Sequence, residues 1–135
     1  MNNEKLKSLN IKSCLDIGSN IGQFYSIITD AHPGIYVELV EPNPWAAGKL
    51  RKRLKHNIVH NCGAGSVNAV MPFHLNKYKR FSKGASFRED FQSVETETMQ
   101  IEVKTVDSLS EGKSFDLIKI DTEGFEFEVL KGCLL

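Results

Sequence analysis

The sequence predicts an α/β fold built on a parallel sheet. Two observations predict it: strand-like apolar runs alternate with helix-like segments, and the first such run ends in a glycine-rich turn. Strands that alternate with helices pair in parallel, because each helix carries the chain back across the sheet. The 135 residues, of which 41% are apolar, suit a single domain with an ordinary core. We expect one domain over residues 1–135, with residues 1–12 as an N-terminal lead-in.

The first strand and its helix are expected between Ser13 and Ala31. The run Ser13–Ile17 (SCLDI) is short, apolar and closed by glycine, which indicates a buried strand. His32-Pro33-Gly34 ends the helix, because proline cannot continue it and glycine turns the chain. Apolar side chains recur at spacings of three and four, which places them on one helical face: Ile21, Phe24, Ile27, Ile28 and Ala31.

The second strand, Ile35–Val40, is followed by a helix with a clear start signal. Pro44 suits the first helical turn and Asn43 suits the cap before it, so we expect this helix to run to about His56. The segment 58–60 (IVH) begins a third, shorter strand. The residues Cys62, Gly63, Ala64 and Gly65 then form a turn.

The middle of the chain is less regular. Val70–Leu75 and Met99–Val106 have the alternation of strands, and the polar stretch Asn76–Thr98 between them is expected to be loop with one short strand. Two extended pieces joined in this way predict an antiparallel insertion. Phe115–Asp121 is the fourth main strand, and Glu123–Leu135 is a helix with Phe125, Val129 and Cys133 on one face.

The turns that follow the strands carry the polar chemistry. In open α/β sheets, ligands bind outside the carboxyl ends of the strands. The first such turn, Asp16–Gly22, has the spacing G-x-N-x-G, in which Gly18 permits a tight turn and Gly22 lets the helix pack closely on the sheet. Glu41 follows 19 residues after Gly22, and its carboxylate can accept two hydrogen bonds from a ribose diol.

The same turns distinguish between nucleotide cofactors. A dinucleotide fingerprint would read G-x-G-x-x-G, and a carboxylate at Asp16 would repel a pyrophosphate, so both features disfavour NAD. A cofactor with a sulfonium and an amino group would be attracted by Asp16 instead. The alternative is that Asp16 and Glu41 only cap helices or shape turns.

Three segments resemble the FkbM-type methyltransferases: LDIGSNIGQF, VELVEPNP and FDLIKIDTEGFEFEVLKG. KGASF at Lys83–Phe87 resembles the Gly-x-Ser element of the family's central insertion, and TVDSL at Thr105–Leu109 resembles the segment before its fourth strand. The resemblance spans Cys14 to Gly132 and is most specific in the last block. It implies a Rossmann-like class I fold that uses S-adenosylmethionine (SAM) to methylate hydroxyl groups of sugars, glycans or small molecules.

The resemblance also implies roles for individual residues. Glu41 would hold the ribose. The turn around Ser19 would cradle the methionine part through Asp16, Gly18, Asn20 and Gly22. The residues flanking the adenine would be Pro42, Asn43, Cys62, Gly63 and Ala64.

The acceptor hydroxyl would lose its proton to a carboxylate after the fourth strand. Glu123 is the first candidate for this role and Asp121 the second. Glu126 lies three residues beyond Glu123, on about the same side of the helix. The alternative is that these acidic residues only stabilise the helix N-terminus through its dipole.

Composition excludes several other classes. Lysine plus arginine and aspartate plus glutamate number 17 each, so nothing in the charge balance requires a nucleic acid or an anionic membrane. The basic run Lys49–His56 is interpreted as a solvated helix face, with binding of acidic substrates or nucleic acids as the alternative. No apolar run approaches the ~20 residues of a membrane span, and the N-terminus does not resemble a signal peptide, so we expect a cytoplasmic protein.

The cysteines and histidines show no ligand spacing. Cys14, Cys62 and Cys133 form an odd set without a C-x-x-C motif, so we expect free thiols rather than disulfides or structural zinc. The four histidines are not spaced as a metal site requires, and we expect no metal. His60 and His74 are nearest to the predicted site, but packed or surface roles suit them better.

The end of the chain leaves alternatives open. Family members have further strands after the fourth, so we expect a chain truncated at its C-terminus, with strand order 3-2-1-4 and an apolar edge strand containing Leu117, Ile118 and Ile120. The insertion covers this edge, a second copy pairs with it in a homo-oligomer, or the chain is a fragment. The functional alternatives are an inactive SAM-binding or partner-binding module, a nicotinamide oxidoreductase and a nucleic-acid methyltransferase. No Asn/Asp-Pro-Pro-aromatic motif for a flipped base follows the fourth strand.

Overall fold

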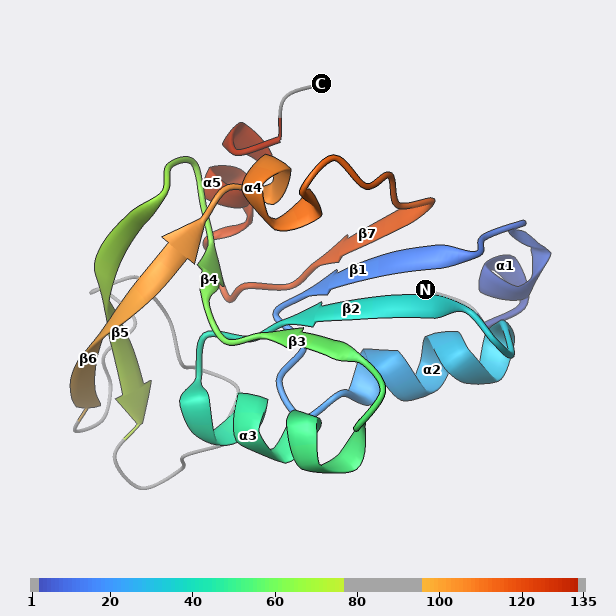
Figure 1. The fold of residues 1–135 in the computed structure, drawn as a ribbon, viewed down its shortest axis with the longest axis horizontal. Coiled ribbons are helices and arrows are strands. Elements are labelled where there is room, and N and C mark those ends of the chain that lie inside the picture. Colours follow the sequence, from blue (N-terminus) through green and yellow to red (C-terminus); the bar gives the residue numbers. More distant parts are fainter. Residues whose placement is uncertain (1–2, 77–95, 134–135) are drawn as a thin grey trace.

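The main sheet of the computed structural model has four parallel strands in the order β3-β2-β1-β7 (Figure 1). The structure describes residues 3–76 and 96–133. The strands are β1 (Ser13–Ile17), β2 (Tyr36–Val40), β3 (Ile58–His60) and β7 (Leu117–Ile120). The α/β class and the strand order predicted from the sequence are both confirmed, with β7 at one edge.

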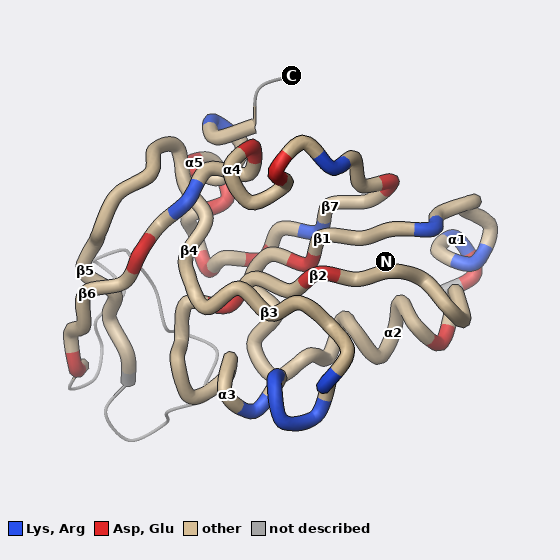
Figure 2. Tube along the Cα trace, in the orientation of Figure 1, with Lys and Arg blue, Asp and Glu red and all other residues tan. Residues whose placement is uncertain are grey.

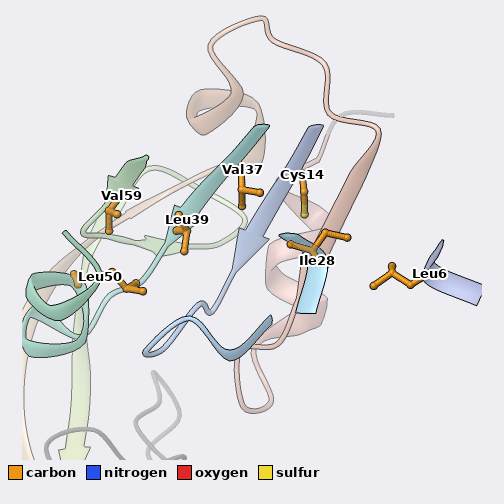
Figure 3. Packing of buried hydrophobic residues seen from close by; sticks show 8 residues of the cluster. Leu6, Cys14, Ile28, Val37, Leu39, Leu50 and Val59 are labelled. Carbon is orange, nitrogen blue, oxygen red and sulfur yellow. The ribbon is translucent and has the colours of Figure 1, made fainter. Parts of the chain in front are cut away.

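Helices cover both faces of this sheet. On one face lie α1 (Asn3–Ser8), α2 (Gln23–Ala31) and α3 (Pro44–Arg53); on the other lie α4 (Val106–Ser110) and α5 (Glu126–Lys131) (Figure 1). Strand side chains alternate between the two faces, and each face has its own buried cluster. Cys14, Ile28, Val37, Leu39 and Leu50 belong to the first cluster (Figure 3), and Leu15, Ile17, Val40, Leu109 and Val129 to the second.

The start of α3 follows the sequence prediction closely. The Asn43 side chain accepts a hydrogen bond from the Trp45 backbone N–H at 3.0 Å, and Pro44 occupies the first turn. The helix ends at Arg53, earlier than the predicted His56, and the Leu54 N–H closes it by donating to the Leu50 carbonyl. This capped start fixes the direction in which the chain leaves the carboxyl end of β2.

A second, smaller sheet holds β4 (Gly63–Ala64), β6 (Thr96–Lys104) and β5 (Ala69–Asn76), in that order. Strands β5 and β6 pair antiparallel, which confirms the predicted insertion. The turn predicted at Cys62–Gly65 is wrong in part, because Gly63 and Ala64 pair in parallel with Val103 and Lys104. Figure 1 shows this sheet beside the carboxyl ends of the main strands.

Other boundaries differ for local reasons. The strand predicted to reach Val106 ends at Lys104, because the Thr105 hydroxyl caps α4 by accepting a hydrogen bond from the Ser108 N–H at 3.1 Å. The helix predicted over 123–135 runs only over Glu126–Lys131. Ile27 on α2, which was predicted to face the core, is 43% exposed. Of the predicted loop Asn76–Thr98, Asn76 ends β5 and Thr96 begins β6. Residues 77–95, with the KGASF segment, lie outside the described residues.

Candidate functional site

A cavity of about 400 Å³ opens at the carboxyl ends of the main strands. Its wall combines the turn after β1, the turn after β2, strand β4 and the turn after β7, with Phe73 from β5 on the side of the second sheet. This volume lies in the range of sites that bury a small-molecule ligand. The predicted residues that line it are Gly18, Ser19, Asn20, Glu41, Pro42, Asn43, Gly63, Ala64, Asp121 and Glu123.

The glycine-rich turn is held at the end of β1 by its own backbone. The N–H groups of Gly18 and Ser19 both donate to the Val40 carbonyl, at 2.9 and 3.1 Å. Gly18 has a φ of +77°, and a Cβ placed there would lie 1.9 Å from the Asp121 carbonyl oxygen. Only glycine permits that conformation and that approach, so the turn after β1 lies directly against the end of β7.

Gly22 does not line the cavity but controls how α2 packs. Its φ is +86°, and a Cβ at this position would lie 2.3 Å from Arg53 Nη2. Arg53 in turn donates to the Gly22 carbonyl at 3.2 Å. The close approach at Gly22 is therefore between α2 and α3, whereas the sequence predicted close packing of the helix on the sheet. Gly22 is also absent from the cavity wall, where the resemblance implied a contact with the methionine part.

Glu41 connects the turn after β1 to the turn after β2. Oε2 accepts the Asn20 N–H at 2.7 Å, and Oε1 accepts the Asn43 N–H at 2.8 Å. The side chain is buried, and burial raises the pKa of the carboxyl to about 7, against the two backbone bonds that lower it. Each oxygen accepts one bond and has acceptor capacity left, so the ionised group can also accept from a ligand hydroxyl.

Asp16 lies behind the cavity wall. Its side chain is fully buried and is absent from the lining, while Lys119 of β7, directly opposite it in the sheet, does line the cavity. Lys119 Nζ lies 3.0 Å from Asp16 Oδ1. Burial raises the pKa of Asp16, and the Lys119 charge lowers it. Of this ion pair, only Lys119 can therefore meet a ligand in the cavity.

The acidic residues after β7 separate into two kinds. Asp121 and Glu123 line the cavity, and the Glu123 backbone is left-handed with a φ of +53°. Glu126 instead folds back, and its Oε1 accepts the N–H groups of Thr122 and Gly124 at 2.9 and 3.1 Å. It therefore closes the turn that presents Glu123, a structural role at the start of α5 that differs from the dipole interaction given as the alternative in the sequence.

Several predicted residues lie off the cavity, and others were missed. Cys62 is buried beside the lining, and burial raises the pKa of its thiol to about 11. Lys119 could have been noticed as a charged residue inside an apolar strand. Ile17 and Val40, which end β1 and β2, also line the cavity. The remaining missed residues follow no sequence signal, because they come from α2, the insertion and the turn after β7: Gln23, Phe24, Ile27, Phe73 and Thr122.

The histidines and cysteines of the described residues form no metal cluster, and no group of three or more potential ligands gathers there. His60 Nε2 lies 2.8 Å from Glu38 Oε2, and His74 Nδ1 lies 3.1 Å from the Thr98 hydroxyl. Neither histidine lines the cavity. Within the described chain, no helix has both the length and the apolar character needed to cross a membrane.

The basic residues gather at the C-terminal half of α3, as Figure 2 shows. Arg51 donates to the Val59 carbonyl at 2.9 Å, and Arg53 donates to the Gly22 carbonyl. Positive charge at a helix C-terminus is favoured by the helix dipole. Two of these cations therefore have structural roles, in agreement with a solvated helix face.

Three comparisons with known proteins agree on one family. A sequence profile described as the methyltransferase FkbM domain matches residues 16–135. "Methyltransferase 1" of Beauveria bassiana (strain ARSEF 2860) is 29% identical over 143 residues, covering 87% of this chain and 57% of that protein. The crystal structure of methyltransferase FkbM from Methylobacillus flagellatus KT superposes with a TM-score of 0.63 at 21% identity, covering 90% of this chain and 28% of that one. The chain thus spans little more than half of one relative and about a quarter of the other.

Proposed function

The chain belongs to the FkbM methyltransferase family, and from this premise we propose that it binds SAM in the cavity and transfers the methyl group to a hydroxyl of a sugar, glycan or small molecule. The observation that carries the proposal is the pair of turns joined by Glu41, which places a buried carboxylate beside a glycine-rich turn at the carboxyl ends of β1 and β2.

The residues present fit such a cofactor. The volume of about 400 Å³ suits a nucleoside with an amino-acid tail. Glu41 offers acceptor capacity for a ribose diol, while Gly63 and Ala64 bring a strand without bulky side chains to the wall. Pro42, Asn43 and the buried Phe73 would bound the adenine on its other sides. The turn Gly18–Asn20 and Lys119 would hold the amino-acid part.

SAM supplies a methyl group on a positively charged sulfur, which an acceptor oxygen attacks in line. The chain's contribution is to hold both reactants, since most of the rate of such a transfer can come from positioning. Glu123 lines the cavity from the turn after β7 and is our first candidate to take or orient the hydroxyl proton, with Asp121 second. The bonds from Thr122 and Gly124 to Glu126 fix this turn.

Binding is tested first, by calorimetry with S-adenosylhomocysteine (SAH). We expect Glu41→Gln to weaken binding at least about tenfold at pH 8, because an amide replaces the charged acceptor of the ribose hydroxyls. Glu102→Gln is the matched control, because that carboxylate is exposed on β6 and does not line the cavity. If the folded wild-type chain binds no SAH, the proposal is wrong.

Turnover is tested next, with radiolabelled SAM and a panel of sugar, glycan and phenolic acceptors. Labelled product that disappears in Glu123→Gln, while SAH affinity is kept, would support methyl transfer to a hydroxyl with Glu123 as the acid-base group. Binding without turnover on every acceptor would favour the alternative of an inactive binding module.

A further inference from the structure

We propose that Lys119 and Asp121 together recognise the amino-acid end of the cofactor, Lys119 through the ligand carboxylate and Asp121 through the ligand ammonium, and that Asp16 acts only by holding Lys119. This inference rests on the proposed function and adds to it a pair of charges on one wall of the cavity. It differs from the sequence prediction, in which Asp16 itself meets the positive part of the cofactor.

The ammonium of Lys119 is held in place by one ion pair and one hydrogen bond. Nζ lies 3.0 Å from Asp16 Oδ1 and donates to the Gly18 carbonyl at 3.0 Å. Its stem passes α2, with Nζ 5.6 Å from the centre of the Phe24 ring. A lysine fixed in this way has lost its rotamer freedom before any ligand arrives, which favours tight recognition.

The ammonium has three N–H donors: the Gly18 carbonyl takes one, and the ion pair with Asp16 occupies at most one more, so at least one donor is available. Asp121 Oδ2 lies 3.9 Å from Nζ, an ion-pair distance that is too long for a hydrogen bond. The Lys119 side chain is 20% exposed and lines the cavity. An acceptor on a ligand in the cavity can therefore complete its hydrogen bonding.

Asp121 supplies the opposite charge on the same wall. Its side chain is 67% exposed, so it can turn towards a ligand without breaking a buried contact. A positive and a negative group 3.9 Å apart are complementary to the zwitterion of an α-amino acid, whose carboxylate and ammonium are similarly close. Because Asp16 is fully buried behind Lys119, its repulsion of a ligand carboxylate is opposed by the nearer lysine.

The test compares two ligands that differ only in the amino-acid part. SAH carries the zwitterion, and 5′-methylthioadenosine carries the same nucleoside without it. We expect Lys119→Met to weaken SAH binding at least about tenfold in calorimetry and to leave the affinity for methylthioadenosine within about twofold. Asp121→Asn is expected to show the same selectivity, and Lys104→Met, on β6 and outside the cavity, to change neither affinity.

A double variant separates recognition from folding. Lys119→Met leaves Asp16 buried without its counter-ion, so the melting temperature should fall. Asp16→Asn combined with Lys119→Met removes that charge and should restore the melting temperature without restoring SAH affinity. Recovery of SAH affinity in the double variant, or an equal loss for both ligands in Lys119→Met, would overturn the inference. A wild-type chain that binds neither ligand would instead overturn the proposed function.

Discussion

The carboxylate of Glu41 has both a structural role and a proposed role in ligand binding. Its carboxylate accepts one backbone N–H from each of two turns, at 2.7 and 2.8 Å, so it holds the cavity in shape as well as lining it. Burial raises the pKa of Glu41 to about 7; the Asp16 charge raises it further and the Lys119 charge lowers it. The group thus changes its charge near neutral pH.

We predict that SAH affinity rises with pH through this value. Below it Glu41 carries a proton, which removes an acceptor from the ribose hydroxyls, and above it the charged group accepts both bonds. If only the ionised form binds, the affinity should increase about tenfold between pH 6 and pH 8. Calorimetry across that range measures it, and Glu41→Gln should show a flat profile at low affinity.

The stability of the unliganded fold changes with pH in the opposite direction to SAH affinity. A carboxyl whose folded pKa lies above its unfolded value retains a proton that the unfolded chain has lost, so stability falls as the pH rises from 4.5 to about 7. The difference in melting temperature between wild type and Glu41→Gln should therefore change across that window. A constant difference would contradict the assigned pKa.

Residue patterns in the sequence predicted the turns well and side-chain directions less well. Gly18, Asn20 and Glu41 line the cavity as expected, because backbone conformation and strand position constrain such turns locally. Asp16 is different: its position at the strand end was evident, but whether it faces a ligand depends on Lys119, which is more than 100 residues away in sequence and opposite in the sheet. Cross-strand partners of this kind are not encoded locally.

At the scale of elements, capping residues set boundaries that the periodicity of apolar residues did not predict. Thr105 interrupts an alternating pattern and starts α4, which the sequence had suggested to be the end of a strand. The two-residue strand β4 was taken for a turn, because its identity depends on pairing with Val103 and Lys104 rather than on its own residues. Long periodic segments such as α2 and α3 were predicted correctly apart from their ends.

We predict that Thr105→Ala lowers the free energy of unfolding by about 1 kcal/mol, the usual loss for an N-cap. The Thr105 hydroxyl is the acceptor for the Ser108 N–H, and alanine leaves that donor without its cap. Urea denaturation measures the change. Thr29→Ala is the matched control, since Thr29 lies inside α2, where its hydroxyl bonds to the preceding turn and alanine is the better helix former.

SAH binding should not depend on the cap of α4. Helix α4 contributes no residue to the cavity wall, so Thr105→Ala should leave SAH affinity unchanged at temperatures where the variant is folded. A large loss of affinity in a folded Thr105→Ala would show that α4 and the cavity are coupled, contrary to the independence inferred here.

At the scale of the whole molecule, two sheets form one cavity. The main sheet contributes the turns at its carboxyl ends, and the insertion contributes Phe73, which packs with Leu75 and Ile101 in a third buried cluster. The sequence predicted both sheets but not their relative placement, because that placement depends on contacts between segments far apart in the chain. The position of the cavity was predictable, whereas the wall from the insertion was not.

The edge of the main sheet formed by β7 is a candidate contact with a second copy of the chain. Strand β7 pairs with β1 on one side, and no strand of the described residues pairs with its other side. Apolar side chains are exposed on β7 and on the helix that follows it: Ile118 on β7 is 39% exposed, and Phe127 and Leu130 on α5 are 69% and 55% exposed. Unpaired edges flanked by apolar groups favour pairing with another strand.

We therefore predict that this chain self-associates through β7, with a second copy adding its own β7 to the edge. Sedimentation velocity should show a dimer whose fraction grows with concentration, and Ile118→Lys should shift the equilibrium to monomer, because a charge at the contact would be desolvated on pairing. Ile58→Lys is the matched control, since Ile58 is 44% exposed on β3, at the opposite edge of the main sheet. A monomer at all concentrations, or equal effects of the two lysines, would show that β7 is not the contact.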